Sequence, residues 1–216
     1  KTEDFTREEM IEKFSFQRVN KAPASFDPAK LMAVQLRYMQ RMDIKKKPAM
    51  CLPYLQKSGL ISDPPSCSVG PQLIQIVEGA GDRITMAGDI LNHDDFFLDT
   101  QDLVFDEKAF KKRVMKEGAT DLLRKFRDTL VDTDEFSSEN LHAVMQSFVE
   151  REEIKIGQVI HAVRVGTTGR AVGFGMFETM EVLGKERCLE RIDRTLEMAA
   201  QSSSQSSSQS SSQSSS

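Results

Sequence analysis

The sequence predicts an all-α protein built of two packed helical subdomains, with no sheet of consequence. Apolar residues recur with the three- and four-residue spacing of one helix face in segment after segment. Residues that favour helix N-termini stand in front of several of these segments. No window shows the sustained apolar-polar alternation of a half-buried strand. The pattern is therefore typical of helical bundles.

The first helix is predicted after Thr6. Thr6 and Glu9 have the spacing of a capping box, in which hydroxyl and carboxylate satisfy each other's helix-end amides. We expect a short helix that buries Met10, Ile11 and Phe14.

The second helix is predicted to begin at Asp27-Pro28. The aspartate can accept from first-turn amides, and proline at the first helical position loses no hydrogen bond. The residues expected on one face of this helix are Leu31, Val34, Tyr38 and Met42.

Proline and glycine divide the next segment. Pro53 stands inside a helical run over 50–55 and should kink or shorten it, and 62–71 is predicted to be a loop. Helical spacing resumes at Leu73, Ile74 and Val77. Gly79-Ala-Gly81 interrupts that helix, so Arg83 is expected beside a bend.

A second set of helices is predicted from about Asp94. Asp106 and Ser137 are candidate N-caps, and Gly118 is expected to end the helix that Asp106 starts. The apolar faces are expected to comprise Ala109, Phe110 and Val114; Leu122, Leu123, Phe126 and Leu130; Leu141, Val144, Met145, Phe148 and Val149; Ile156, Val159, Ile160 and Val163; Phe177, Met180 and Leu183; and Cys188, Leu189, Ile192 and Leu196.

A glycine-rich break over 166–175 separates two of these helices. It could cradle a phosphate, but it lacks a Gly-Lys-Ser/Thr ending and follows a helix rather than a strand. A plain interhelical connection is the simpler reading. However, Arg164, Arg170, Phe174 and Phe177 surround the glycines, and cationic and aromatic side chains near exposed backbone are typical of single-stranded RNA sites.

Composition excludes several classes of function. The 216 residues carry a net charge of −4, which argues against indiscriminate nucleic-acid binding, DNA included, but allows a local, shaped contact. No apolar run is long enough to span a membrane. The Gln-Ser repeat over 201–216 has no apolar side chains and is expected to be disordered.

No catalytic or metal site is predicted. Cys51, Cys67 and Cys188 are widely spaced, which fits neither a disulfide framework nor a zinc cluster and favours a reducing, cytoplasmic setting. We interpret His93-Asp94-Asp95 as a surface helix cap, because consecutive residues point in different directions and no second cluster supplies further ligands.

Motifs spread along the chain carry a family resemblance. Together they resemble the region that follows the catalytic core in bacterial-type glutamyl-tRNA synthetases, which are class I aminoacyl-tRNA synthetases. The motifs are Phe5-x-x-Glu-Glu-x-Ile-x-x-Phe-Ser-x-x-Arg18-Val19, Pro23-Ala-x-Phe-Asp-x-x-Lys-Leu31, Lys155-Ile-Gly-x-Val159, Arg164-Val-x-x-Thr-Gly169 and Phe177-Glu-x-Met-x-x-Leu-Gly-Lys-Glu-Arg187.

The resemblance implies a C-terminal anticodon-binding region. It implies that 1–30 ends a linking, stem-contact region and that two anticodon-binding helical subdomains follow, over 31–95 and 96–200. The start at Lys1 suggests a piece of a longer protein. No cofactor is expected in this chain, and ATP and Mg are expected in the catalytic module of that longer protein, which attaches glutamate to tRNA(Glu).

The resemblance also implies site residues. It places Arg83 at the third anticodon base and Arg164 at the first bases. It also implies a loop that wraps those first bases and two candidate contacts with phosphates. The loop residues are Gly173, Phe174, Met176 and Phe177, and the phosphate contacts are Lys21 and Arg170. The expected partner of this monomer is tRNA(Glu), with tRNA(Gln) left open. The alternative is a helical protein-interaction scaffold without intrinsic RNA affinity.

Overall fold

The computed structural model describes residues 4–20, 22–23, 25–173 and 175–212. Within that part every regular element is a helix and no strand occurs, so the all-α prediction is confirmed. The α-helices are α1 (Arg7–Lys13), α2 (Pro28–Arg41), α3 (Lys47–Lys57), α4 (Val69–Ala80), α5 (Glu107–Arg113), α6 (Ala119–Val131), α7 (Ser138–Arg151), α8 (Ile160–Thr168), α9 (Met176–Leu183) and α10 (Lys185–Ser212). The 3-10 helices are η1 (Phe16–Arg18), η2 (Gly81–Arg83), η3 (Ala87–Phe96), η4 (Thr100–Asp102) and η5 (Ile156–Gln158).

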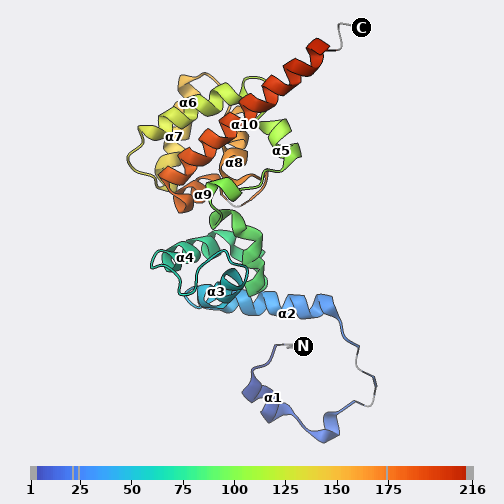
Figure 1. Ribbon diagram of the computed structural model, residues 1–216. Helices are drawn as coiled ribbons and strands as arrows, with labels where there is room; N and C mark the ends of the chain where they lie inside the picture. The colour runs from blue at the N-terminus through green and yellow to red at the C-terminus, as the bar shows by residue number, and fades with distance from the viewer. Residues whose placement is uncertain (1–3, 21, 24, 174, 213–216) are drawn as a thin grey trace.

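The helices form two groups that follow one another along the molecule (Figure 1). The first contains α3 and α4, with α2 leading into it from an N-terminal loop. The second contains α5 to α10, and η3 runs up to the junction between the groups. The subdomain boundary at residue 95 stays a prediction, and it falls within this last stretch of η3.

The apolar core is continuous across the two groups. Helix α4 packs against α9, and buried side chains from both groups belong to one cluster. Its members include Leu55, Leu73, Ile76, Phe126, Phe148, Met180 and Ile192. The junction is therefore packed, which fixes the elements that meet there.

A buried arginine contributes hydrogen bonds across the junction. The fully buried Arg191 of α10 donates to the carbonyl oxygens of Thr167, Asp95 and Leu98, each at 2.8 Å. Burial lowers the pKa of Arg191 to about 10, still well above neutrality. One guanidinium thus satisfies backbone groups at the end of α8 and at the end of η3.

Local signals for helix starts are confirmed. The predicted caps each accept a hydrogen bond from a first-turn backbone N–H, and they are Thr6, Asp27, Asp106 and Ser137. Pro53 lies inside α3, and the helix continues past it to Lys57. Helix α4 continues through Gly79 and gives way at Gly81 to the bend that was predicted.

Two glycine- or serine-based boundaries were wrong. Gly118 does not end α5, which stops at Arg113; instead, with φ of 75°, it is the N-cap of α6. The predicted loop over 62–71 ends early, because α4 begins at Val69. Both residue types favour turns, but their position relative to a helix depends on tertiary packing.

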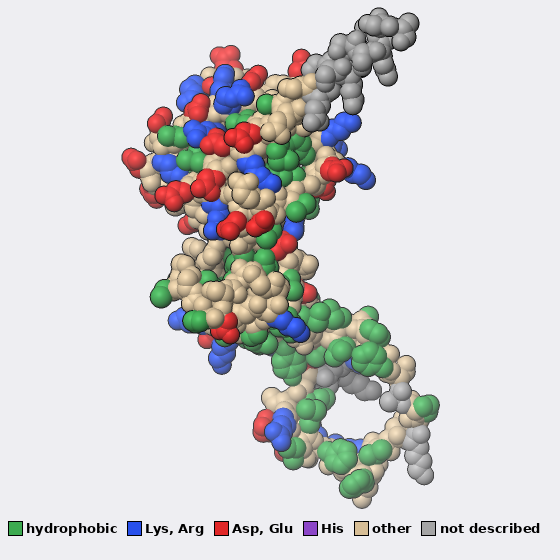
Figure 2. Space-filling view, in the orientation of Figure 1, with side chains coloured by type: hydrophobic (Ala, Val, Ile, Leu, Met, Phe, Trp, Pro, Cys, Tyr) green, Lys and Arg blue, Asp and Glu red, His purple; other side chains and the backbone are tan. Residues whose placement is uncertain are grey.

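The predicted burial of the N-terminal apolar residues was also wrong. Met10, Ile11 and Phe14 are 54%, 68% and 63% exposed, and α1 buries none of its residues. The start of this segment is held to α2 by an ion pair between Asp4 and Arg37 at 2.7 Å. Figure 2 shows apolar side chains on the surface of the N-terminal segment that precedes α2.

The C-terminal repeat differs from the expected disorder. Helix α10 continues to Ser212, and residues 201–204 are exposed. The hydroxyls of Ser202, Ser203 and Ser204 donate to backbone carbonyls four residues earlier. These three hydrogen bonds lie within the helix itself.

Candidate nucleic-acid interface

The turn that follows α8 is built on a glycine that no other residue replaces without strain. Gly169 has φ of 73°, and a Cβ there would lie 2.3 Å from the carbonyl oxygen of Val104. Its own carbonyl accepts from the N–H of Asp106 at 2.8 Å. The start of the glycine-rich break is therefore seated on the 104–106 segment, and it is a defined turn.

Arg164 is half-buried on α8 and reaches the backbone of this break. A Cβ placed on Gly173 would lie 3.4 Å from Nη1 of Arg164. Burial lowers the pKa of Arg164, the carboxylate of Glu178 opposes that shift, and the charge of Arg83 adds to it. The structure thus brings Arg164 and Gly173 together, as expected from the sequence, and adds Glu178 to them.

Arg83 approaches the same place from the first helical group. It ends η2, two residues after Gly81, which has φ of 53° and breaks α4. Its charge lowers the pKa of both Arg164 and His93. Arg83 is exposed and has no hydrogen-bond or ion-pair partner among the described residues. Two like charges held in proximity favour an electron-rich ligand.

His93 is a member of the cluster that the sequence did not reveal. It is half-buried, and its φ of −115° and ψ of 33° depart from helical values within η3. It lines a small cavity of about 70 Å³ together with Arg170 and Gly173. Burial lowers the pKa of His93, and Arg83 and Arg170 add to the shift, so the imidazole is mostly neutral at pH 7.

Asp95 lines the same cavity, and the expectation of a surface cap was wrong for it. It is 7% exposed. Burial raises its pKa to about 6, although the charge of Arg170 works against the shift. The run His93-Asp94-Asp95 is instead part of the packed junction, because the turn after α8 covers it.

Arg170 joins the turn to η3. Its Nη1 donates to the carbonyl oxygen of Asn92 at 2.7 Å, and its Nη2 pairs with Asp94 at 2.6 Å. The side chain is 43% exposed, and its contact with a phosphate stays a prediction. Its established bonds position the residues on either side of His93.

The other predicted site residues divide by burial. Phe177 is half-buried, and its ring meets His142 edge to face at 5.2 Å between centroids. Met176 is 4% exposed and packs in the main core, which is at odds with a side-chain contact to RNA. Phe174 and Lys21 lie outside the described residues.

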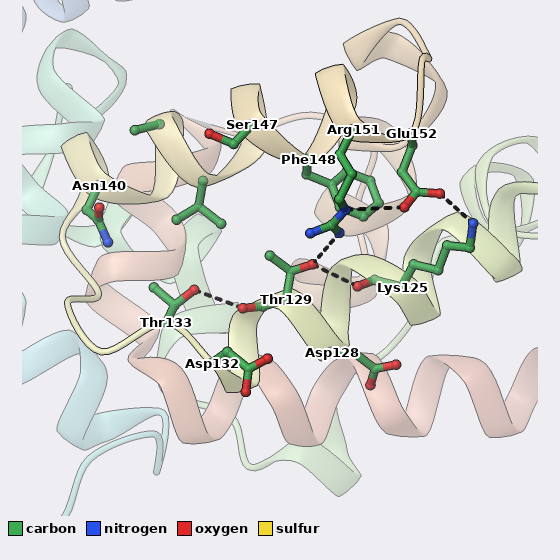
Figure 3. A pocket seen from close by; sticks show the side chains of 12 residues that line it. Lys125, Asp128, Thr129, Asp132, Thr133, Asn140, Ser147, Phe148, Arg151 and Glu152 are labelled. Atoms are coloured by element: carbon green, nitrogen blue, oxygen red, sulfur yellow. Dashed lines mark hydrogen bonds and ion pairs between the residues drawn. The ribbon is translucent and has the colours of Figure 1, made fainter.

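A larger groove than the cavity at His93 lies elsewhere, between α6 and α7 (Figure 3). Its volume is about 630 Å³. Lys125 pairs with Glu152, and Arg151 donates to the hydroxyl of Thr129 at 3.1 Å. Its charged lining comprises Lys125, Arg151, Asp128, Asp132 and Glu152. Carboxylates outnumber cations there, so the groove does not suit a polyanion.

On the face that Figure 2 shows, acidic and basic side chains are interspersed over the second helical group. Among the described residues, no group of three or more potential metal ligands comes together. No described helix is long and apolar enough to cross a membrane. The most distinctive polar feature is therefore the cluster of Arg83, Arg164, Arg170 and His93 around the turn after α8.

Comparisons with known proteins identify the family. A family described as "Anticodon binding domain" matches residues 46–196. The glutamate–tRNA ligase of Moorella thermoacetica is 31% identical over 187 residues, covering 87% of this chain and 38% of that protein. The glutamate–tRNA ligase of Streptomyces avermitilis is 35% identical over 192 residues, covering 89% of this chain and 38% of that protein.

Solved structures support the same assignment. The glutamate-tRNA synthetase of Elizabethkingia anophelis superposes with a TM-score of 0.70 at 25% identity, covering 88% of this chain and 36% of that one. The glutamate tRNA ligase of Elizabethkingia meningosepticum gives a TM-score of 0.74 at 24% identity, a likeness of fold. This chain thus spans well under half the length of its relatives. It belongs to the anticodon-binding domain family, in the form found in the C-terminal region of glutamyl-tRNA synthetases.

Proposed function

We propose that this chain recognises the anticodon of tRNA(Glu) as part of a glutamate–tRNA ligase that attaches glutamate to tRNA using ATP. The observation that carries the proposal is the exposed, glycine-rich turn at which Arg164 lies against Gly173, with the charge of Arg83 acting on Arg164. The two arginines come from different helical groups, so the anticodon would be read at the junction. ATP, Mg and the catalytic residues belong to the part of the longer protein that this chain lacks.

The chemistry of the cluster supports reading of single-stranded bases. Arginine donates from a rigid planar fork, which suits the acceptor atoms of an unpaired base or a phosphate. The half-buried setting of Arg164 weakens competition from water. The absence of a side chain at the exposed Gly173 leaves its backbone accessible to a base.

We propose that Arg83 contacts the third anticodon base. Glutamate and glutamine anticodons differ there, with cytosine in one and guanine in the other. Cytosine offers acceptors at O2 and N3, whereas guanine turns N1 and N2 donors toward the same place. A donor-only side chain therefore favours cytosine, since guanine leaves buried polar groups unpaired. A monomeric state and a cytoplasmic location stay predictions.

Filter binding tests the proposal. The chain is titrated with tRNA(Glu) and with the same tRNA carrying an unrelated anticodon, at moderate salt. We expect tighter binding of tRNA(Glu) by at least about tenfold, which corresponds to one good base contact. Equal affinities would favour the alternative, a helical protein-interaction scaffold.

A further inference from the structure

Helix α5 and the turn after it carry a run of cations that the described part of the protein does not neutralise. Segment 107–117 has five cations against two carboxylates, and the cations are Lys108, Lys111, Lys112, Arg113 and Lys116. None of the five forms an ion pair with a carboxylate that the structure describes. On α6, by contrast, Arg124, Lys125 and Arg127 each pair with a carboxylate. The five residues form the α5 basic face, which is open to an external anion.

The packing of α5 turns this face outward. The opposite side of the helix buries Ala109, Phe110 and Val114 in a cluster with Val165 of α8. The four lysines are exposed, and Arg113 is half-buried. In Figure 2, basic side chains project from the edge of the second helical group where Figure 1 places α5. The cations are therefore presented to solvent.

The helix dipole accounts for only part of the run. It stabilises cations in the last turn of a helix, where Lys111, Lys112 and Arg113 stand. Lys108 stands in the first turn, where the dipole disfavours a cation, and Lys116 lies beyond the end of the helix. These two lysines add positive charge that the helix itself does not require, so an external anion explains the run better.

Helix α5 begins at the turn where the anticodon is proposed to bind. The N–H of Asp106, which is the N-cap of α5, donates to the carbonyl oxygen of Gly169 at 2.8 Å. The seven residues of α5 extend about 10 Å from there, which is about one Debye length at 0.1 M salt. Phosphates of an RNA seated at the turn are therefore within the field of α5.

The field of α5 also reaches α8. Burial lowers the pKa of His161, and the charges of Arg113 and Arg164 add to that shift. The basic residue at the end of α5 and the arginine of the candidate site thus act on the same side chain. Their charges add to one another in attracting a polyanion.

We propose that the α5 basic face binds phosphate groups of the anticodon arm, beside the bases that the turn contacts. Phosphates carry no sequence information, so these contacts orient the RNA and raise its affinity without selecting the anticodon. The groove between α6 and α7, where carboxylates outnumber cations, disfavours an approach of the RNA from that side. This inference rests on the proposed function.

The salt dependence of RNA binding tests this role. Fluorescence anisotropy gives the Kd of a labelled anticodon stem-loop of tRNA(Glu), and of one with an unrelated anticodon, between about 50 and 200 mM salt. The variant Lys108→Gln/Lys112→Gln removes two exposed cations that lie one turn apart on α5. The control Arg124→Gln/Arg151→Gln removes the same net charge from exposed positions on α6 and α7. Circular dichroism and urea midpoints check that both variants fold.

Each phosphate contact that is lost lowers the slope of log Kd against log salt concentration by about 0.7–0.9. We expect the α5 variant to lose about 1.4–1.8 from this slope. Its weakening relative to wild type should then be roughly tenfold greater at 50 mM than at 200 mM salt. Both stem-loops should weaken equally, because phosphates are the same in each. The control should keep the wild-type slope to within about 0.5.

Three results would overturn the inference. A wild-type slope in the α5 variant would leave this face to another partner, such as an acidic protein. An equal loss of slope in both double variants would show an effect of net charge alone. Weakening of only one stem-loop would mean that α5 contacts bases.

The same measurements separate this inference from the proposed function. If the wild-type chain binds both stem-loops equally, the proposed function fails, and the inference that rests on it falls as well. If the wild-type chain prefers the tRNA(Glu) stem-loop and the α5 variant keeps both that preference and the wild-type slope, the proposed function stands and only this inference falls.

Discussion

Arg170 donates through Nη1 to the carbonyl oxygen of Asn92 at 2.7 Å, across 78 positions of sequence. The bond joins the turn after α8 to η3, and so it joins the two helical groups beside Arg164 and Arg83. Arg191 reinforces the connection from the buried side by donating to the carbonyls of Thr167 and Asp95. The candidate site is therefore a property of the junction, and predictions about it concern both RNA affinity and stability.

Arg164→Ala is expected to weaken binding of the tRNA(Glu) anticodon stem-loop roughly 10- to 100-fold, because a forked contact with a base or phosphate is lost. Circular dichroism should show little loss of helical content, since Arg164 is only half-buried on α8. Arg124→Ala removes an equal charge from an exposed ion pair with Asp121 and is the control. Equal effects of the two variants would mean that Arg164 acts only through net charge.

Arg83→Gln is expected to relax discrimination at the third anticodon base. Glutamine both donates and accepts on a shorter side chain, so it tolerates guanine better than arginine does. The ratio of Kd values for the guanine and cytosine stem-loops should fall by roughly 10- to 100-fold, measured by anisotropy. A ratio within about twofold of wild type would show that Arg83 faces a phosphate or supports the fold.

Asp95→Asn is expected to stabilise the protein at alkaline pH. Burial raises the folded-state pKa of Asp95 to about 6 from its ordinary 3.8, so folding favours the protonated acid. The stability that this group contributes is present below about pH 4 and is lost as pH rises through 6. The variant should gain about 1–3 kcal/mol over wild type between pH 4 and pH 8 in urea denaturation.

Asp4→Asn provides a control of opposite sign for this pH dependence. Its hydrogen bond to Arg37 lowers the pKa of Asp4, so the stability it contributes is present at neutral pH and lost in acid. The variant should be less stable than wild type at pH 7, with the difference shrinking as pH falls. An Asp95→Asn effect that does not change with pH would contradict a buried, ionising carboxyl at the junction.

Gly169→Ala is expected to cost roughly 2–5 kcal/mol of unfolding free energy, because left-handed backbone strain adds to a backbone clash. A Cβ would lie 2.3 Å from the carbonyl oxygen of Val104. Gly118→Ala has the matching φ of 75° but open space around it, and should cost only about 1–2 kcal/mol. Equal urea midpoints for the Gly169→Ala and Gly118→Ala variants would show that the turn after α8 can move to accommodate a Cβ.

The sequence predicted what local chemistry determines. Caps such as Thr6 and Asp27 depend on groups two or three residues away, and they are present. The helix periodicity identified most of the core in the second group. It also identified the apolar residues of α1, but periodicity shows which residues share a face and not whether anything covers it. Met10 and Phe14 are exposed for that reason.

The candidate site was predicted in part. The glycines before Arg83 predicted the bend there. The glycines after Arg164 predicted that this arginine lies beside a turn. The contribution of His93 was not, because it depends on Arg170 reaching η3 across the junction. The sequence His-Asp-Asp is the same whether the run caps a surface helix or lies beneath a turn from a distant part of the chain. Only the fold distinguishes the two.

Hydrogen–deuterium exchange with and without the tRNA(Glu) anticodon stem-loop tests the location of the site most directly. The account predicts slower exchange in 81–96 and 169–173 when the RNA is bound, since these segments carry Arg83, His93 and the turn beside Arg164. Exchange in 125–133 and 140–152, which line the acidic groove between α6 and α7, should not change. Protection confined to the groove, or absent from both junction segments while the RNA is bound, would contradict the claim that the anticodon is read at the junction.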